Sequence, residues 1–116
     1  MILRIREWII VVLVCCLTAC YQEPPEPNTP ISREKLASIL ADTHLAEAML
    51  TEVSPGRKKD SLAQLYYEQI YAIHEVSAQE VEASMQAYME NPYALDSLYV
   101  QVVEQLNAGK DKHSTE

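Results

Sequence analysis

The sequence of 116 residues contains no phenylalanine, only two glycines and only three cysteines. Both glycines, Gly56 and Gly109, stand at predicted helix ends, and no stretch alternates apolar and polar residues as an exposed strand does. A β-rich fold is therefore not expected. All three cysteines lie within the first 20 residues, so the rest of the chain has no thiol for a disulfide or a thiolate metal site.

Basic residues are also scarce. Nine Lys and Arg stand against 17 Asp and Glu, which gives a net charge of −8. This balance argues against nucleic acid as a partner, because such proteins carry basic patches. It also argues against a domain lying flat on an anionic lipid leaflet. We interpret the one basic cluster, Arg57-Lys58-Lys59, as a solvated loop next to Pro55 and Gly56, and contact with a phosphate-bearing lipid or partner is the alternative.

The N-terminus has the parts of a secretory signal peptide, which we place at residues 1–19. Arg4 and Arg6 precede a continuous apolar run, Trp8 to Cys16, that is shorter than the 20 or so residues a membrane span needs. Leu17-Thr18-Ala19-Cys20 resembles the bacterial lipobox. The resemblance implies cleavage before Cys20 and attachment of diacylglycerol and an acyl chain such as palmitate to that cysteine. The alternative is an ordinary signal peptide cut elsewhere, with a free thiol.

Residues 20–30 are rich in proline and predict a semi-rigid extended tether of about 30 Å. Such a tether would hold the folded part away from the lipid headgroups. Tyr21 stands where an aspartate would resemble an inner-membrane retention signal, which favours the outer membrane. The sequence leaves open whether the domain faces the periplasm or the cell surface.

The remaining chain predicts an all-α domain at residues 31–107, followed by a polar tail at 108–116. We expect helices over 33–52 and 61–74, a third that begins with the capping box Ser77-Ala78-Gln79-Glu80, and a fourth from Pro92 to Gly109 with Asn91 as its cap. Each helix has a narrow apolar stripe that needs the others to cover it, so we predict a small bundle of three or four short helices. The stripe of the second helix consists of Leu62, Leu65, Tyr66, Gln69, Ile70 and Ile73.

Two segments resemble a family of small lipoproteins from Bacteroidetes-type bacteria, catalogued as a domain of unknown function. The first is the D-x-H-L-A-E-A pattern at residues 42–48, and the second is the region around Asn91-Pro92 with its following helix. Members often carry a glycine after the position of His74, where this chain has Glu75. The resemblance implies an envelope location and a helical fold, and it implies no known reaction.

Asp42, His44 and Glu47 are the candidate site residues of the first domain helix. Glu47 falls within the apolar stripe, and a carboxylate at the edge of a core needs a partner, so we interpret the three as a polar clasp that bonds one helix to another. The alternative is a metal or acid–base site on His44 and Glu47. Zinc needs three or four ligands, and no second pair of this kind is evident.

Tyr67 and Tyr71 lie one turn apart and point away from the predicted stripe of their helix, which suggests a partner-binding surface. We therefore expect a non-catalytic interaction module, without metal or cofactor, that is anchored to the membrane through Cys20 and binds another envelope protein of an assembly or transport machine. The alternatives are a metal-binding or enzymatic role using His44 and Glu47, and glycan or peptide binding through the two tyrosines.

Overall fold

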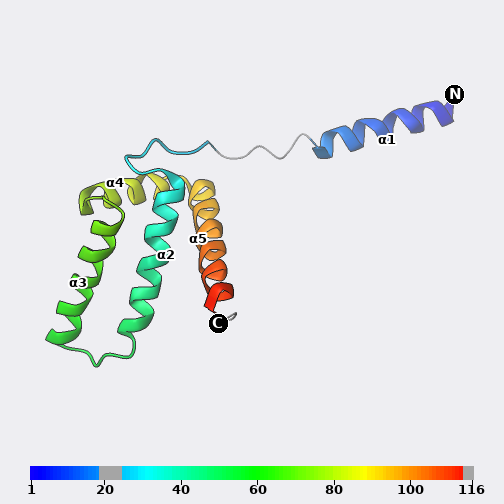
Figure 1. The fold of residues 1–116 in the computed structure, drawn as a ribbon. Helices are drawn as coiled ribbons and strands as arrows, with labels where there is room; N and C mark the ends of the chain where they lie inside the picture. Colours follow the sequence, from blue (N-terminus) through cyan, green and yellow to red (C-terminus); the bar gives the residue numbers. More distant parts are fainter. Residues whose placement is uncertain (19–24, 114–116) are drawn as a thin grey trace.

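The computed structural model describes residues 1–18 and 25–113, and every regular element in these two ranges is a helix. The all-α prediction is therefore confirmed (Figure 1). The helices are α1 (Ile2–Thr18), α2 (Arg33–Leu50), α3 (Arg57–Ile73), α4 (Ala78–Met89) and α5 (Pro92–His113).

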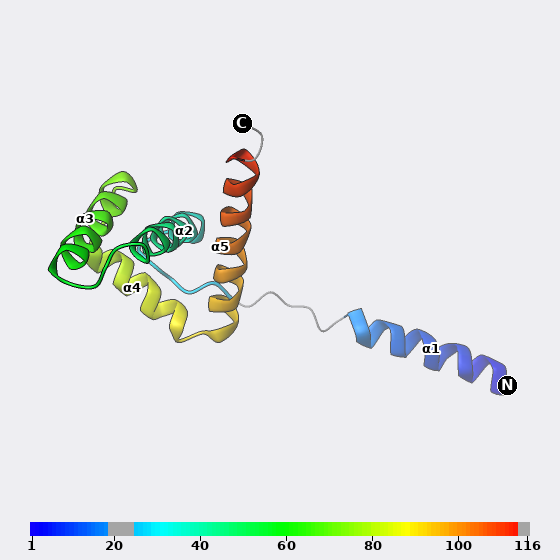
Figure 2. The ribbon, with the colours of Figure 1, turned by 90° about the horizontal axis from the view of Figure 1, so that it is seen from below.

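The central helix of the domain is α2, which lies between α3 and α5 (Figure 1). Helix α4 crosses one end of this arrangement and contacts α5. Figure 2 shows that α5 runs at a steep angle to α2, so the two helices meet closely at one end and diverge toward the other. The bundle is consequently open along part of the α2–α5 junction.

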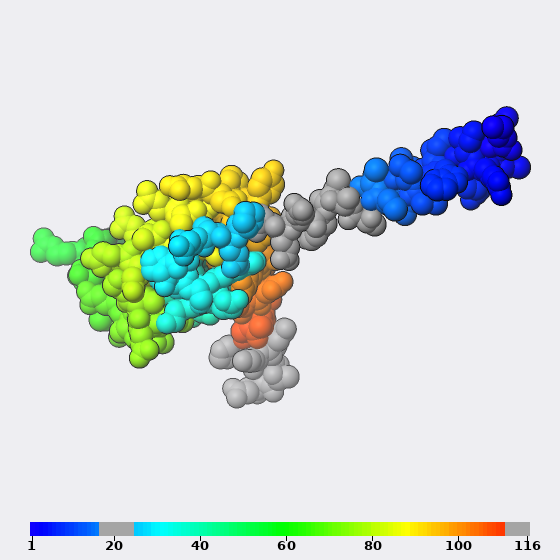
Figure 3. Space-filling view, turned by 90° about the horizontal axis from the view of Figure 1, so that it is seen from above, coloured from blue at the N-terminus to red at the C-terminus, as the bar shows by residue number. Residues whose placement is uncertain are grey.

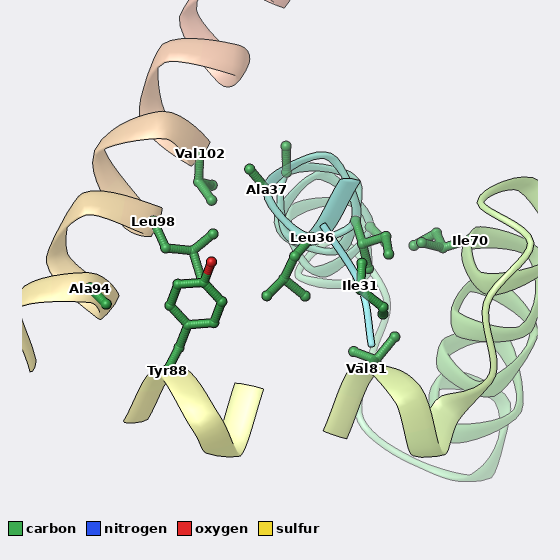
Figure 4. Packing of buried hydrophobic residues seen from close by; sticks show 12 residues of the cluster. Ile31, Leu36, Ala37, Ile70, Val81, Tyr88, Ala94, Leu98 and Val102 are labelled. Carbon is green, nitrogen blue, oxygen red and sulfur yellow. The ribbon is translucent and has the colours of Figure 1, made fainter. Parts of the chain in front are cut away.

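The core gathers at the end where α2, α4 and α5 meet (Figure 4). The ring of Tyr88 from α4 lies between Leu36 of α2 and Leu98 of α5. Burial removes these apolar side chains from water, which supplies the main driving force for folding. The buried apolar residues are Ile31, Leu36, Ala37, Ile39, Ala41, Ala46, Leu50, Ile70, Val81, Tyr88, Ala94, Leu98 and Val102.

The predicted N-caps of α4 and α5 are confirmed. The Ser77 hydroxyl accepts a bond from the Glu80 amide while the Glu80 carboxylate accepts one from the Ser77 amide, which completes the capping box. The Asn91 side-chain oxygen accepts a bond from the amide of Ala94. These bonds satisfy amides that the first helical turn leaves without a partner.

Helix α3 differs from its prediction in both its start and its orientation. It begins at Arg57 with Gly56 as N-cap, so Arg57-Lys58-Lys59 form the first helical turn rather than a loop. Its buried face is also rotated: Ile73 is 75% exposed, whereas Tyr71 packs against the core beside Ile70. The predicted stripe is confirmed at Tyr66 and Ile70 and wrong at Leu65 and Ile73, because the neighbour α2 decides which side of a tyrosine-rich helix is covered.

Helix α5 passes through Gly109 and ends at His113, so the polar tail predicted from residue 108 is helical as far as residue 113. A single glycine inside a helix costs only about 1 kcal/mol relative to alanine. Gly109 does not take a positive φ, and a Cβ at this position would meet no atom within 4 Å. The glycine therefore does not end the helix.

The turn after α3 places Glu75 in the left-handed region, with a φ of 55°. The amide of Val76 donates to the carbonyl of Tyr71 (3.0 Å), and the amide of Glu75 donates to the carbonyl of Ala72 (3.2 Å). This pair of bonds is the Schellman motif, in which the position of Glu75 strongly prefers glycine. The turn thus keeps the left-handed backbone that glycine favours, although Glu75 is strained in this conformation.

We expect Glu75→Gly to raise the free energy of unfolding by about 0.5–1 kcal/mol, because it relieves the left-handed strain and the gain exceeds the added entropy of the unfolded chain. Glu75→Ala keeps a Cβ at the same φ and should give no such gain. Urea unfolding of the three proteins measures the difference. Equal stability of the glycine and alanine variants would contradict the prediction.

Residues 25–31 lie against the domain instead of extending away from it (Figure 3). Ile31 is buried in the core, and the side-chain amide of Asn91 donates to the carbonyl of Pro25 (3.3 Å). The Arg33 guanidinium donates to the Glu26 carboxylate and to the carbonyl of Ser97, both at 3.0 Å. The part of the predicted tether from Pro25 onward is therefore held by the domain, and a free tether of about 30 Å is wrong.

Helix α1 carries the apolar run of the predicted signal peptide, and its large apolar side chains are exposed. Among the described helices, none combines the length and the hydropathy that crossing a membrane requires. Cys20 and the rest of segment 19–24 lie outside the described residues, so cleavage and lipidation remain predictions.

Candidate functional site

Asp42 and His74 form the shortest polar contact between α2 and α3. The Nε2 atom of His74 donates to Oδ2 of Asp42 at 2.7 Å, since a carboxylate only accepts. The His74 side chain is mostly buried and that of Asp42 is half-exposed. His74 caps the C-terminus of α3, so this bond fixes the end of α3 against the middle of α2.

Glu47 makes a second contact between the same helices. The hydroxyl of Tyr67 donates to Oε1 of Glu47 at 3.2 Å. His44 lies on the other side of this carboxylate, with 3.7 Å between its Nδ1 and the second oxygen, Oε2. His44 and Glu47 are both exposed and both on α2, so their pairing does not join two helices.

Tyr67 and Tyr71 do not point away from the domain, and the expectation of an outward pair was wrong. Their rings stack with 6.5 Å between centroids. Tyr71 packs against the core, and Tyr67 reaches across to Glu47. The rotation of α3 turns both toward α2, so their main contacts are inside the domain.

We expect Asp42→Ala to lower the free energy of unfolding by about 1–2 kcal/mol, because it leaves the buried nitrogen of His74 without its acceptor. His44→Ala should change it by less than about 0.5 kcal/mol, since that side chain is exposed and bonds no other helix. Thermal unfolding of both variants measures this contrast. A larger loss for His44→Ala than for Asp42→Ala would refute the assignment of Asp42 as the joining residue.

Ionisation of the Tyr67 hydroxyl is expected to lower the free energy of unfolding at alkaline pH. Partial burial, together with the negative charge of Glu47, raises the pKa of the Tyr67 hydroxyl above its ordinary value of 10.0. A raised folded-state pKa contributes stability below the unfolded pKa, and this contribution disappears as the pH rises through the folded pKa. Above a pH of about 10, we expect the free energy of unfolding to fall less steeply with rising pH in Tyr67→Phe than in the wild type. Tyr93→Phe, at an exposed position, is the control, and identical pH profiles of wild type and Tyr67→Phe would contradict the expectation.

Among the side chains that the structure describes, those of residues 1–16 and 25–110, no group of three or more His, Cys, Asp and Glu is placed to hold one ion. Asp42 and Glu47 are instead engaged with α3, and His44 with Glu47. What this arrangement can do is to bond α2 to α3.

A groove of about 950 Å³ lies between the diverging halves of α2 and α5, and sequence reasoning missed it. Its walls are mainly apolar or small. The lining includes Ala41, Asp42, His44, Leu45, Ala48, Val103, Leu106 and Lys110. The signal in the sequence was Leu45, an apolar residue outside the predicted stripe of its helix.

The surface around this groove, which we call the α2–α5 groove, is apolar and acidic. Leu45 is 56% exposed, and Val100 and Val103 are similarly accessible on α5. Asp96 and Glu104 line a shallow hollow on the same part of α5. Between Leu36 and Gly56, and again between Pro92 and Leu106, the sequence contains no Lys or Arg. Lys110, near the end of α5, is therefore the single Lys or Arg among the residues that line the groove.

Comparison with protein families gives one match, which covers residues 27–112 and is described as a domain of unknown function (DUF4296). The chain belongs to this family. The family match spans all four helices of the domain, from the docked segment before α2 to the last turn of α5. It confirms the predicted resemblance to a family of unknown function, while the lipoprotein type remains a prediction. Comparison with curated proteins gives no match, and neither does comparison with solved structures.

Proposed function

We propose that this DUF4296 protein is a lipid-anchored, non-catalytic interaction module of the outer membrane. In this proposal, Cys20 holds the protein on the membrane and the α2–α5 groove receives an amphipathic helix of another envelope protein. The lipobox supports the anchor, and the open apolar groove is the single observation that supports the binding role. Exposed apolar surface of this kind is typical of interaction sites.

The chemistry of the partner follows from the groove. An apolar stripe on the partner helix would cover Leu45, Val103 and Leu106, and burial of these side chains would supply binding free energy. Lys110 is the single Lys or Arg among the residues that line the groove, and Asp96 and Glu104 lie on the same part of α5, which favours basic residues beside that stripe. The partner is therefore a helix with an apolar face and basic flanks.

The test is site-specific photo-crosslinking in cells. A photoreactive residue at Leu45 or at Val103 should capture one envelope protein through a peptide with an apolar stripe and basic flanks, identified by mass spectrometry. Leu65 is the matched control, because it is an exposed leucine on α3 away from the groove. The same probe there should not give this adduct.

Matched variants distinguish the groove from a general effect of charge. With the probe at Leu45, Val103→Asp should abolish the adduct, whereas Leu65→Asp should leave it intact. Capture of the same protein from Leu65 would overturn the assignment of the groove. Capture of a second copy would replace the partner with self-association, and no adduct from membranes that contain the protein would refute the binding role.

A further inference from the structure

The proposed lipidation of Cys20, if it occurs, determines which end of the domain faces the membrane. The chain enters the domain at Pro25, whose carbonyl is bonded to Asn91 at the turn between α4 and α5. Glu26 is held by Arg33, and Ile31 is buried. The first described residue of the domain is thus fixed at the end formed by α4 and the N-termini of α2 and α5 (Figure 3).

Covalent geometry limits the distance from this point to the lipid. Five residue steps separate Cys20 from Pro25, and an extended chain covers at most about 3.6 Å per residue, which gives about 18 Å. A helix of 18 residues such as α2 is itself about 27 Å long. The anchor is therefore shorter than the domain, and the end that carries Pro25 must stay next to the membrane.

Two exposed side chains flank the bond that fixes Pro25. Met89 ends α4 and is 60% exposed, and Tyr93 is the second residue of α5 and is 76% exposed. Tyrosine combines an apolar ring with a polar hydroxyl, which suits the interface between lipid headgroups and acyl chains, and methionine is a flexible apolar side chain. Neither residue belongs to the buried core of the domain.

We propose that Met89 and Tyr93 form a membrane contact, and that the occupant of this surface is the headgroup region of a bilayer with little negative charge. Charge supports this choice of lipid. Helix α4 and its C-cap carry Glu80, Glu82 and Glu90 and no Lys or Arg, and at the N-terminus of α2 Arg33 is paired with Glu26 while Glu34 offsets Lys35. An anionic surface would repel this end, whereas a zwitterionic one leaves the apolar contact undisturbed.

This orientation leaves the α2–α5 groove accessible. The groove is lined by the second half of α2, from Ala41 to Ala48, and by α5 from Val103 onward. These segments lie toward the end of the domain opposite Pro25 (Figure 1). A membrane contact at Met89 and Tyr93 therefore directs the groove away from the lipid.

Tryptophan fluorescence tests the contact in the mature, lipidated protein. The only tryptophan of the sequence, Trp8, leaves with the signal peptide, so Tyr93→Trp introduces a single probe. Reconstituted in phosphatidylcholine vesicles, this variant should show blue-shifted emission and lose intensity to lipids with bromine near the headgroup. Met49→Trp, at an exposed position on the last turn of α2, is the control and should show neither effect.

The outcomes separate the two proposals. Equal quenching at both positions, or none at Tyr93→Trp in protein whose lipid is verified by mass spectrometry, would overturn the membrane contact and leave the anchor intact. An unmodified Cys20 would overturn both, because the limit of about 18 Å depends on lipid at that residue. Stronger quenching in anionic than in zwitterionic vesicles would refute the choice of lipid.

Discussion

Replacing Tyr88 by alanine is expected to lower the free energy of unfolding by about 3–5 kcal/mol. The side chain is 1% exposed, and its ring fills the junction between Leu36 and Leu98 (Figure 4). No neighbouring helix is free to fill the space, because α2 and α5 are held at this end by Arg33, which bonds both Glu26 and the carbonyl of Ser97. The variant should therefore leave a cavity.

Tyr88→Phe separates packing from the hydroxyl. It keeps the ring and removes only the hydroxyl, so the loss in the free energy of unfolding should stay below about 1.5 kcal/mol, the upper end for a single polar group. Urea unfolding followed by circular dichroism measures both variants. A domain of this size gains about 5–15 kcal/mol on folding, so the alanine variant is expected to approach or cross the limit of stability. Equal losses for alanine and phenylalanine would show that the ring does not carry the effect.

The second large effect is expected at Leu36, where alanine should cost about 2–5 kcal/mol. Leu36 is 0% exposed and lies at the centre of the cluster that joins α2 to Ile31, Val81 and Tyr88. Shortening this side chain removes its contacts with several elements at once. The lost stability includes both the free energy of burying the removed atoms and the cost of the cavity that they leave.

Leu45→Ala is the matched control, because it makes the same substitution on the same helix at an exposed position. Its effect should stay below about 0.5 kcal/mol. The melting temperature should fall by about 4–8 °C for each kcal/mol lost in a domain of this size. If Leu45→Ala is as destabilising as Leu36→Ala, the assignment of the core in this region is incorrect.

The sequence by itself determined the class of fold and the starts of three helices, α2, α4 and α5. Capping is local, so the bonds between Ser77 and Glu80 and the cap of Asn91 were predictable from four or five adjacent residues. The family pattern was equally local. The same holds for Asp42 and Glu47, because polar groups at the edge of a stripe need partners wherever the helix packs.

Only the tertiary structure decided which partners these groups have and which surfaces are covered. Asp42 meets His74 across 32 residues, a pairing that no local pattern contains. The orientation of α3 depends on α2, which turns Tyr67 and Tyr71 inward. The docking of Pro25 and the divergence of α2 from α5 are likewise results of packing. Periodicity shows that a helix has an apolar face, but the neighbours determine how much of that face is buried.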